Sequence, residues 1–489
     1  MAAWSRSRQP ASSRRVTQVA NPVPVALSME AARGWACGAG VAVMGTTLDA
    51  GRWARSRPGT VRDRKRDWKT ASMRRRQLLA LSPALALAAC TSPEQGDGAD
   101  PVLPADPEAT SGGEEKGSNP TRGEGTGSGD ETEQTEPAPG PWDPSEQVTG
   151  LLEQLTPREV AGQLVMVGIT AGSTLPSEIL REHHAGGIFL LDVWRDPDQV
   201  NGMVAAAREG SRPELPPLVA VDQEGGQVRM LRGDAARRTP SAEELGEAGP
   251  DAVGDAYTSI GEDLAARGIQ VAFSPVADVV DPALGPANEP VGGLGRGFGT
   301  DPAHVGDCVR AAVQSLHDAG TGATLKHFPG LGRVEQNTDH SAEGIIDDTT
   351  TIEDPFLASF RAGIDAGAEL VMLASATYAQ IDSEAPAMFS RAVVTDLLRD
   401  RLGFEGVAVT DDIGAAKAVA AVPVPERATR FLDAGGDVLL TADPSITGQL
   451  VDAIQEWASR GPKQEQRVRE SAARMLTLKE RRGLLGSGG

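Results

Sequence analysis

Cysteine, aromatic residues and positive charge are all scarce in this chain. Its 489 residues include 3 Cys and 2 Tyr, and aromatic residues make up 4% of the total. Downstream of Cys90 only Cys308 remains, so the region that follows Cys90 cannot contain a disulfide. The 47 Lys and Arg are outnumbered by 68 Asp and Glu, which gives a formal net charge of −21. An acidic chain is poorly suited to bind nucleic acid, and we expect no nucleic-acid partner.

Several motifs that mark common enzyme classes are also missing. No G-x-S-x-G stretch occurs, which excludes the nucleophile elbow of an α/β-hydrolase. The stretch "GGLGRGFG" (Gly292 to Gly299) lacks the Lys-Ser/Thr ending of a phosphate-binding loop and follows no predicted strand, so we interpret it as a flexible loop. His183 and His184 are neighbours with no third ligand at metal spacing. We therefore expect neither a metal nor a cofactor.

The first 90 residues have the composition of an export signal behind an unrelated extension. Residues 1–72 are rich in Arg, poor in acids and without apolar periodicity. In residues 73–90, three arginines precede an apolar run that is too short to span a bilayer and ends in Leu-Ala-Ala-Cys90. This end resembles a bacterial lipobox, which implies lipidation of Cys90. A signal must lie at the N-terminus, so we expect Met73 to be the true start and residues 1–72 to be a mis-called extension. The alternative interpretation of residues 73–90 is a buried helix.

Residues 91–144 consist largely of Gly, Pro, Ser, Thr and acids, with almost nothing apolar. Such a segment buries too little surface to offset the entropy of ordering it, so we expect a disordered acidic tether. Together, the signal, Cys90 and the tether predict an exported lipoprotein on the outer face of the cytoplasmic membrane. The lipid would be its only membrane contact, and we expect the folded part to be a monomer.

Residues 145–486 alternate short apolar runs with amphipathic stretches. Eight candidate strands begin near Gly162, Ala185, Pro217, Ile269, Gly322, Ala368, Gly406 and Gly435. Helical patterns lie between them, such as Asp301 to Gly320 and Thr350 to Gly367. Strands that are almost continuously apolar are typical of a sheet covered on both faces. Eight β-then-α units predict a (β/α)8 TIM barrel, with a doubly wound open sheet as the alternative.

Polar residues follow the predicted strands, at the end of a barrel where active sites lie. They are Asp222 and Glu224 after the third strand, Asp278 after the fourth, Lys326 and His327 after the fifth, and Asp411 and Asp412 after the seventh. Carboxylates, a cation and histidines suit hydrolysis of a sugar acetal, and they equally suit proton abstraction beside a carbonyl. The residues by themselves leave both reactions open.

Five stretches resemble family 3 glycoside hydrolases of the β-N-acetylhexosaminidase branch. "KHFPGLG" (Lys326 to Gly332) resembles the signature K-H-F-P-G-H-G, and "VDQEGGQV" from Val221 resembles D-x-E-G-G. The other three are "FSPVADV" from Phe273, "RGFG" from Arg296 and "LRDRLGFEGVAVTDDIG" from Leu398 to Gly414. The resemblance covers nearly all of residues 145–486 in the family's order. It implies a retaining glycosidase that acts on a carbohydrate, such as an N-acetylglucosamine-containing glycan or muropeptide.

The resemblance also implies roles for individual residues. Asp411 would be the nucleophile, held ionised with a low pKa by Lys326 or Arg296. Asp222, Arg296, Lys326 and His327 would bind the sugar hydroxyls.

The acid/base of this branch is a histidine in an Asp-x-His pair on the loop after the fifth strand. Here that loop reads "GLGRVEQNTDH". One inserted residue would place His340 at the histidine position, with Asp339 as its partner or as an alternative acid. Three positions depart from the family's pattern. Leu331 stands where the signature has its second His, Ser375 stands where the family usually has another His, and Met230 stands where an Arg is expected. A sugar-binding lipoprotein without turnover and a glycoside phosphorylase therefore remain alternatives to a hydrolase.

Overall fold

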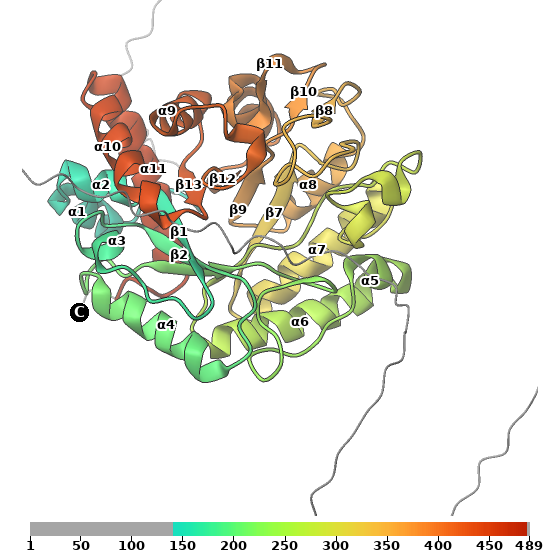
Figure 1. Cartoon of the computed structure of the whole chain (residues 1–489), viewed down its shortest axis with the longest axis horizontal. Coiled ribbons are helices and arrows are strands. Elements are labelled where there is room, and N and C mark those ends of the chain that lie inside the picture. The colour runs from blue at the N-terminus through green and yellow to red at the C-terminus, as the bar shows by residue number, and fades with distance from the viewer. Residues whose placement is uncertain (1–139, 487–489) are drawn as a thin grey trace, which may run out of the picture. The chain divides into compact units, whose positions relative to one another are not determined.

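The computed structural model describes residues 140–486, and these form a closed barrel of eight parallel strands surrounded by helices (Figure 1). The predicted signal, Cys90 and nearly all of the expected tether lie outside the described residues. Neighbouring strands pair in the order β1-β13-β12-β9-β7-β6-β3-β2, which closes the sheet on itself. The predicted (β/α)8 barrel is confirmed, and the open sheet is excluded. The barrel strands are β1 (Val165–Thr170), β2 (Gly187–Leu191), β3 (Leu218–Val221), β6 (Val271–Ala272), β7 (Gly322–Phe328), β9 (Leu370–Leu373), β12 (Val407–Asp412) and β13 (Val438–Thr441).

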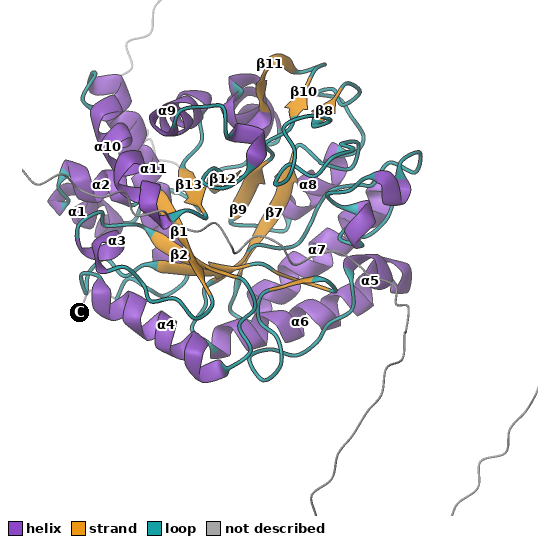
Figure 2. Cartoon of the chain, in the orientation of Figure 1, coloured by secondary structure: helices purple, strands orange, loops and turns teal. Residues whose placement is uncertain are grey.

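Helices cover the outside of the barrel, and short strands decorate its loops (Figure 2). The helices are α1 (Glu146–Gln154), α2 (Pro157–Gly162), α3 (Ser177–Arg181), α4 (Pro197–Gly210), α5 (Ala242–Ala248), α6 (Pro250–Ala266), α7 (Pro302–Asp318), α8 (Leu357–Asp365), α9 (Val424–Ala434), α10 (Thr447–Ala458) and α11 (Pro462–Arg481). A π-helical segment spans Ala392–Arg401, and short 3-10 turns span Gly285–Ala287, Gly292–Leu294, Ala387–Phe389, Lys417–Val419 and Pro444–Ile446. The additional strands are β4 (Gln223–Gly225), β5 (Val228–Arg229), β8 (Ile346–Asp347), β10 (Thr377–Tyr378) and β11 (Asp382–Pro386).

The helix ends follow the capping residues of the sequence. Asp301 caps α7 by accepting the backbone N–H groups of Ala303 and His304, which are among the first donors without a partner in any helix. The helix predicted from Thr350 begins only at Leu357, so its first turns were wrong. There the Asp347 carboxylate accepts the N–H groups of Thr349 and Thr350 at 2.8 Å each and holds a turn instead.

Two apolar clusters stabilise the fold, one inside the barrel and one between the barrel and its helices. The inner cluster includes Phe189 and Met372 from the strands, Phe273 directly after β6, and Met475 and Leu478 from α11. α11 therefore closes the amino end of the barrel, away from the carboxyl ends of the strands. Among the described helices, none is both long and apolar enough to cross a membrane.

Candidate active site

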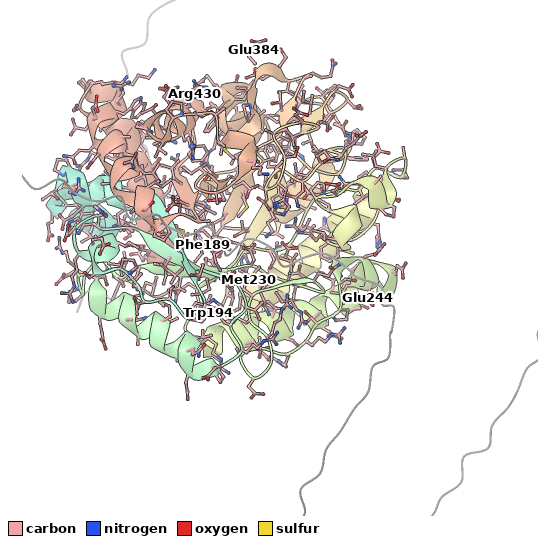
Figure 3. All side chains as sticks on the ribbon, in the orientation of Figure 1. Phe189, Trp194, Met230, Glu244, Glu384 and Arg430 are labelled. Carbon is pink, nitrogen blue, oxygen red and sulfur yellow. The ribbon has the colours of Figure 1, made fainter. Side chains whose placement is uncertain are left out.

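A pocket of about 770 Å³ opens at the carboxyl ends of the barrel strands. Every residue assigned by sequence to the sugar or to proton transfer lines this pocket: Asp222, Arg296, Lys326, His327, Asp339, His340 and Asp411. The strands and loops that supply them are far apart in the chain, and closure of the barrel brings them together. Phe189 and Met230 contribute apolar surface to the same pocket, and both lie near the middle of the molecule in Figure 3.

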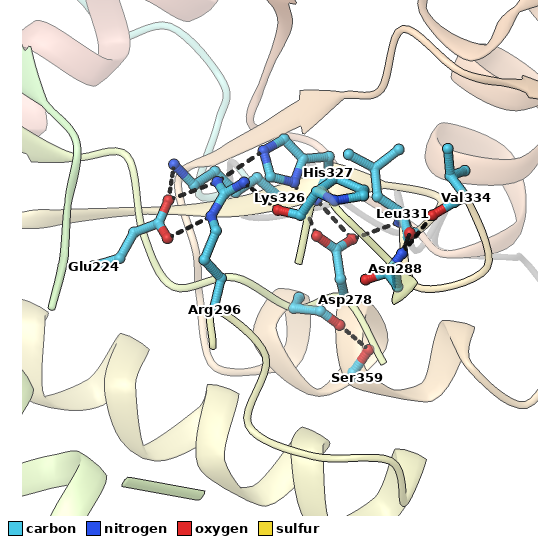
Figure 4. Close-up of polar contacts among 12 residues, drawn as sticks. Glu224, Asp278, Asn288, Arg296, Lys326, His327, Leu331, Val334 and Ser359 are labelled. Atoms are coloured by element: carbon cyan, nitrogen blue, oxygen red, sulfur yellow. Dashed lines mark hydrogen bonds and ion pairs between the residues drawn. The ribbon is translucent and has the colours of Figure 1, made fainter. Parts of the chain in front are cut away.

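Glu224 is the buried centre of an ion network on one wall of the pocket (Figure 4). Its carboxylate accepts two hydrogen bonds of 2.8 Å from the Arg296 guanidinium and lies 2.6 Å from the Lys326 ammonium. Burial alone would raise the pKa of Glu224, but Arg296 and Lys326 outweigh it and lower that pKa to about 2. The carboxylate therefore stays ionised and holds both cations in place.

Lys326 also pairs with Asp222, and the two side chains differ in how far they reach the solvent. The Lys326 ammonium donates to Asp222 Oδ1 at 2.5 Å. Its side chain is 2% exposed, whereas that of Asp222 is 23% exposed. Burial would lower the pKa of Lys326, but Asp222 and Glu224 raise it, so the lysine remains charged. Asp222 is the member of this pair that can accept a hydrogen bond from a ligand.

A second buried carboxylate, Asp278, orients His327. The His327 Nδ1–H donates to Asp278 Oδ2 at 2.9 Å, and Asp278 Oδ1 accepts the backbone N–H groups of His327 and Leu331. With Nδ1 protonated, Nε2 accepts from Arg296 Nη2 at 3.3 Å. The peptide bond between Lys326 and His327 is cis. Hydrogen bonds to Asp222 and Asp278 hold the side chains of Lys326 and His327 in place before any ligand binds.

The two adjacent aspartates at the end of β12 have different environments. The carboxylate of Asp412 accepts backbone N–H groups from Gly414, Ala415, Ala416 and Ala442, so it holds the loop together. Asp411 accepts only the N–H of Asp412, at 2.8 Å, and forms no ion pair within residues 140–486. Asp411 is therefore the carboxylate of the two that is free to react.

The pKa of Asp411 is raised, and the expectation of a low value was wrong. Burial raises the pKa of Asp411 to about 6, and the negative charge of Asp339 adds to the shift. The neighbouring His327 acts in the opposite direction and lowers the pKa of Asp411. Lys326 and Arg296 pair with Asp222 and Glu224 instead of with Asp411.

The loop after β7 carries Asp339 and His340, and both are exposed at the pocket. Its backbone is held in place: Asp339 N–H donates to Asn337 Oδ1 at 2.9 Å, and Thr338 O accepts the N–H of Ala418 at 3.2 Å. In the described part of the chain, no hydrogen bond or ion pair joins the His340 ring to a carboxylate. The structure thus brings His340 to the pocket without the carboxylate partner that the sequence predicts.

Three residues that support the site were given no role by sequence reasoning. Glu224 lies two residues after Asp222, and Asp278 lies within "FSPVADV". Both follow predicted strands, and this position was the available signal. Asn288 is fully buried and donates to the backbone oxygens of Leu331 and Val334, which ties two loops of the site together. Nothing in the irregular stretch around Asn288 signals this role.

Fold and pocket together define the class: a (β/α)8 barrel whose pocket, at the carboxyl ends of its strands, is lined by carboxylates, cations and histidines. Residues 156–478 match the model of the glycosyl hydrolase family 3 N terminal domain. The chain therefore belongs to glycosyl hydrolase family 3, and the resemblance seen in its motifs is confirmed.

The curated relatives and solved structures that the chain resembles include several β-hexosaminidases. A β-hexosaminidase of Xanthomonas oryzae pv. oryzae is 36% identical over 284 residues, which cover 54% of this chain and 82% of the relative. A β-hexosaminidase of Xanthomonas campestris pv. campestris is 35% identical over 303 residues, which cover 60% and 88%. The crystal structure of a β-N-acetylhexosaminidase from Beutenbergia cavernae has a TM-score of 0.64 at 40% identity, and the match covers 67% of this chain and 99% of that one.

Proposed function

We propose that this chain is a retaining β-N-acetylhexosaminidase that removes terminal β-linked N-acetylglucosamine-type sugars. Its family and the names of its relatives support this function. The structural observation that carries the proposal is Asp411, a pocket carboxylate at a barrel strand end that, among residues 140–486, forms no ion pair and accepts only the N–H of Asp412. With a pKa of about 6, Asp411 is largely ionised at neutral pH and can act as a nucleophile.

In the proposed reaction, an Asp411 oxygen attacks the anomeric carbon as the bond to the leaving-group oxygen breaks. That oxygen takes a proton from the acid on the loop after β7, for which His340 is our first candidate and Asp339 the alternative. The product of this step is an ester between the sugar and Asp411. The same loop residue then removes a proton from water, and the water oxygen attacks the anomeric carbon and displaces Asp411. The released sugar has the anomeric configuration of the substrate.

Asp222, Arg296, Lys326 and His327 are proposed to hold the sugar ring. Their mutual ion pairs and hydrogen bonds support this role because groups fixed before binding lose little entropy when the sugar arrives. Asp222 offers the most accessible oxygen of the Glu224 network. Charge-assisted hydrogen bonds from such a set distinguish one hydroxyl arrangement from another.

Hydrolysis of p-nitrophenyl N-acetyl-β-D-glucosaminide tests the function. We expect turnover by the wild type and a loss of at least about 10³-fold for Asp411→Asn, since loss of a nucleophile costs this much or more. Asp396→Asn, an exposed aspartate on the π-helical segment, is the matched control and should keep full activity. Equal rates for wild type and Asp411→Asn would contradict the proposal, as would turnover that requires phosphate. Calorimetric binding of muropeptides without cleavage would identify a sugar-binding protein instead.

The proton donor is tested by comparing His340→Ala with Asp339→Asn. If His340 is the acid, His340→Ala loses about 10² to 10⁴ in rate on a natural disaccharide. The loss is smaller on the p-nitrophenyl substrate, whose leaving group needs little protonation. The same pattern in Asp339→Asn, with His340→Ala unaffected, would assign the acid to Asp339.

We further propose that the natural substrate is a peptidoglycan fragment and that the protein is a lipoprotein anchored through Cys90 at the outer face of the cytoplasmic membrane. The lipobox-like sequence before Cys90 supports the anchor, and a position beside the cell wall supports the substrate. Mass spectrometry of the mature N-terminus is the test. A diacylated Cys90 is expected, and an unmodified terminus at Met1 or Met73 would refute the anchor.

A further inference from the structure

A second pocket, of about 330 Å³, lies at the amino ends of β12 and β13, at the end of the barrel opposite Asp411. Five cationic side chains line it: Arg391 directly before the π-helical segment, Arg399 within that segment, and Lys463, Arg467 and Arg474 from α11. Such a concentration of positive charge is unusual in a chain whose net charge is −21. The proposed glycosidase chemistry has no use for it.

Asp437 anchors the floor of this pocket. It is fully buried, and three guanidinium groups share its carboxylate: Arg399 through Nη2, Arg467 at 3.1 Å and Arg474 at 3.3 Å. The carboxylate also accepts the Ser471 hydroxyl at 2.8 Å. Burial would raise the pKa of Asp437, but the three guanidiniums hold it well below its usual range.

One carboxylate cannot neutralise three guanidiniums, so two positive charges stay uncompensated at the pocket floor. Burial lowers the pKa of Arg399 to about 10, and the neighbouring Arg474 and Arg467 add to this shift. At the rim, Arg391 pairs with Asp396 at 3.6 Å, and Lys463, Asp433 and Glu470 also line the pocket. The excess of two positive charges therefore belongs to the floor, where the single carboxylate of Asp437 faces three guanidinium groups.

Two of the cations keep donors for a ligand. Within the part of the chain that the structure describes, Arg474 forms a single hydrogen bond, from Nη1 to Asp437, and its side chain is 30% exposed. Lys463 is exposed, and its ammonium has no hydrogen-bond or ion-pair partner among residues 140–486. Arg399 and Arg467 are less exposed and are fixed by backbone oxygens. The pocket thus has a rigid cationic floor and two accessible donors.

We propose that this pocket binds a dianionic phosphate group, carried either by inorganic phosphate or by a phosphomonoester. A phosphate monoester carries about −1.5 to −2 charges at pH 7, which matches the uncompensated charge. Arginine forks suit tetrahedral oxyanions because they donate two parallel hydrogen bonds. The inference is independent of the proposed hydrolase function, since the pocket lies at the other end of the barrel.

Isothermal titration calorimetry of the full chain at pH 7.5 and constant ionic strength tests the proposal. Inorganic phosphate and glycerol 3-phosphate are the two probes, and we expect saturable binding of at least one. Arg474→Gln and Lys463→Gln should each weaken binding about tenfold or more, as expected for a lost charged hydrogen bond. Arg430→Gln, an exposed arginine paired with Glu426 on α9, is the matched control and should bind like the wild type.

Glycosidase assays on the same variants separate a lost site from a lost fold. Arg474→Gln and Lys463→Gln should hydrolyse p-nitrophenyl N-acetyl-β-D-glucosaminide at the wild-type rate. Tighter binding of glycerol 3-phosphate than of inorganic phosphate would identify a phosphomonoester as the ligand, and the reverse would identify free phosphate. Absence of saturable binding for both probes, or equal binding by Arg474→Gln and Arg430→Gln, would overturn the proposal.

Discussion

Replacing Glu224 by Gln removes the charge that holds Arg296 and Lys326 in the site. The Glu224 carboxylate makes three contacts of 2.6 to 2.8 Å with these cations and is 3% exposed. Breaking a buried ion pair by removing one partner costs about 3 to 5 kcal/mol, because the remaining charges stay buried without compensation. Gln has nearly the same volume as Glu, so a cavity adds nothing to this cost. The free energy of unfolding should therefore fall by about 3 to 5 kcal/mol.

Guanidinium denaturation followed by tryptophan fluorescence measures this loss. Glu426→Gln is the matched control, because Glu426 pairs with Arg430 at 2.7 Å but both side chains are about half exposed. An exposed pair contributes about 0 to 1 kcal/mol. We also expect Glu224→Gln to reduce kcat/KM, since Lys326 and Arg296 lose their fixed positions. A Glu224→Gln protein no less stable than Glu426→Gln would refute the view that this network is energetically important.

Two further predictions concern pH. Because the pKa of Asp411 is about 6 in the folded protein, above its unfolded value, kcat/KM should fall about tenfold per unit below pH 6. Its charge also costs stability above pH 6 but not below about pH 4, so Asp411→Asn should be more stable than wild type by about 1 to 3 kcal/mol at pH 7.5 and equal at pH 4. Gains of equal size at both pH values would contradict this.

Lys479 is fully buried with Gln163 Oε1 as its partner at 2.6 Å, and burial lowers its pKa to about 7. The buried charge of Lys479 therefore lowers the free energy of unfolding below pH 7, and this cost declines between about pH 7 and 10. Lys479→Met should accordingly raise the denaturation midpoint more at pH 6.5 than at pH 9.5. A gain independent of pH would argue against a buried charge.

The strands and the barrel could be predicted from the sequence because each strand lies in a short apolar run. The strand of "IQVAFSPVADV" is shorter than its apolar pattern suggests, with β6 covering only Val271–Ala272. Pro275 lacks a backbone N–H and therefore interrupts the hydrogen-bond ladder beyond the end of β6. The positions of the chemistry-bearing residues were predictable because the ends of parallel strands meet at one face.

The partners of those residues could not be predicted. Arg296 lies 72 residues from Glu224, and only closure of the barrel decides that it pairs there rather than beside Asp411. The wrong expectation for the pKa of Asp411 follows from this, since the cations assigned to it serve another carboxylate. The loop that carries Asp339 and His340 follows no periodic pattern, so its hydrogen bonds to Asn337 and to the Lys417–Val419 turn were beyond sequence reasoning.

Identification of the residue that becomes covalently glycosylated tests the central claim most directly. Acid quenching during turnover of a dinitrophenyl N-acetyl-β-D-glucosaminide traps the intermediate, because departure of this leaving group is fast and the second step becomes limiting. Peptide mass spectrometry should then find one N-acetylhexosaminyl group on Asp411. A label on Asp339 or on another residue, with Asp411 unmodified, would contradict the account.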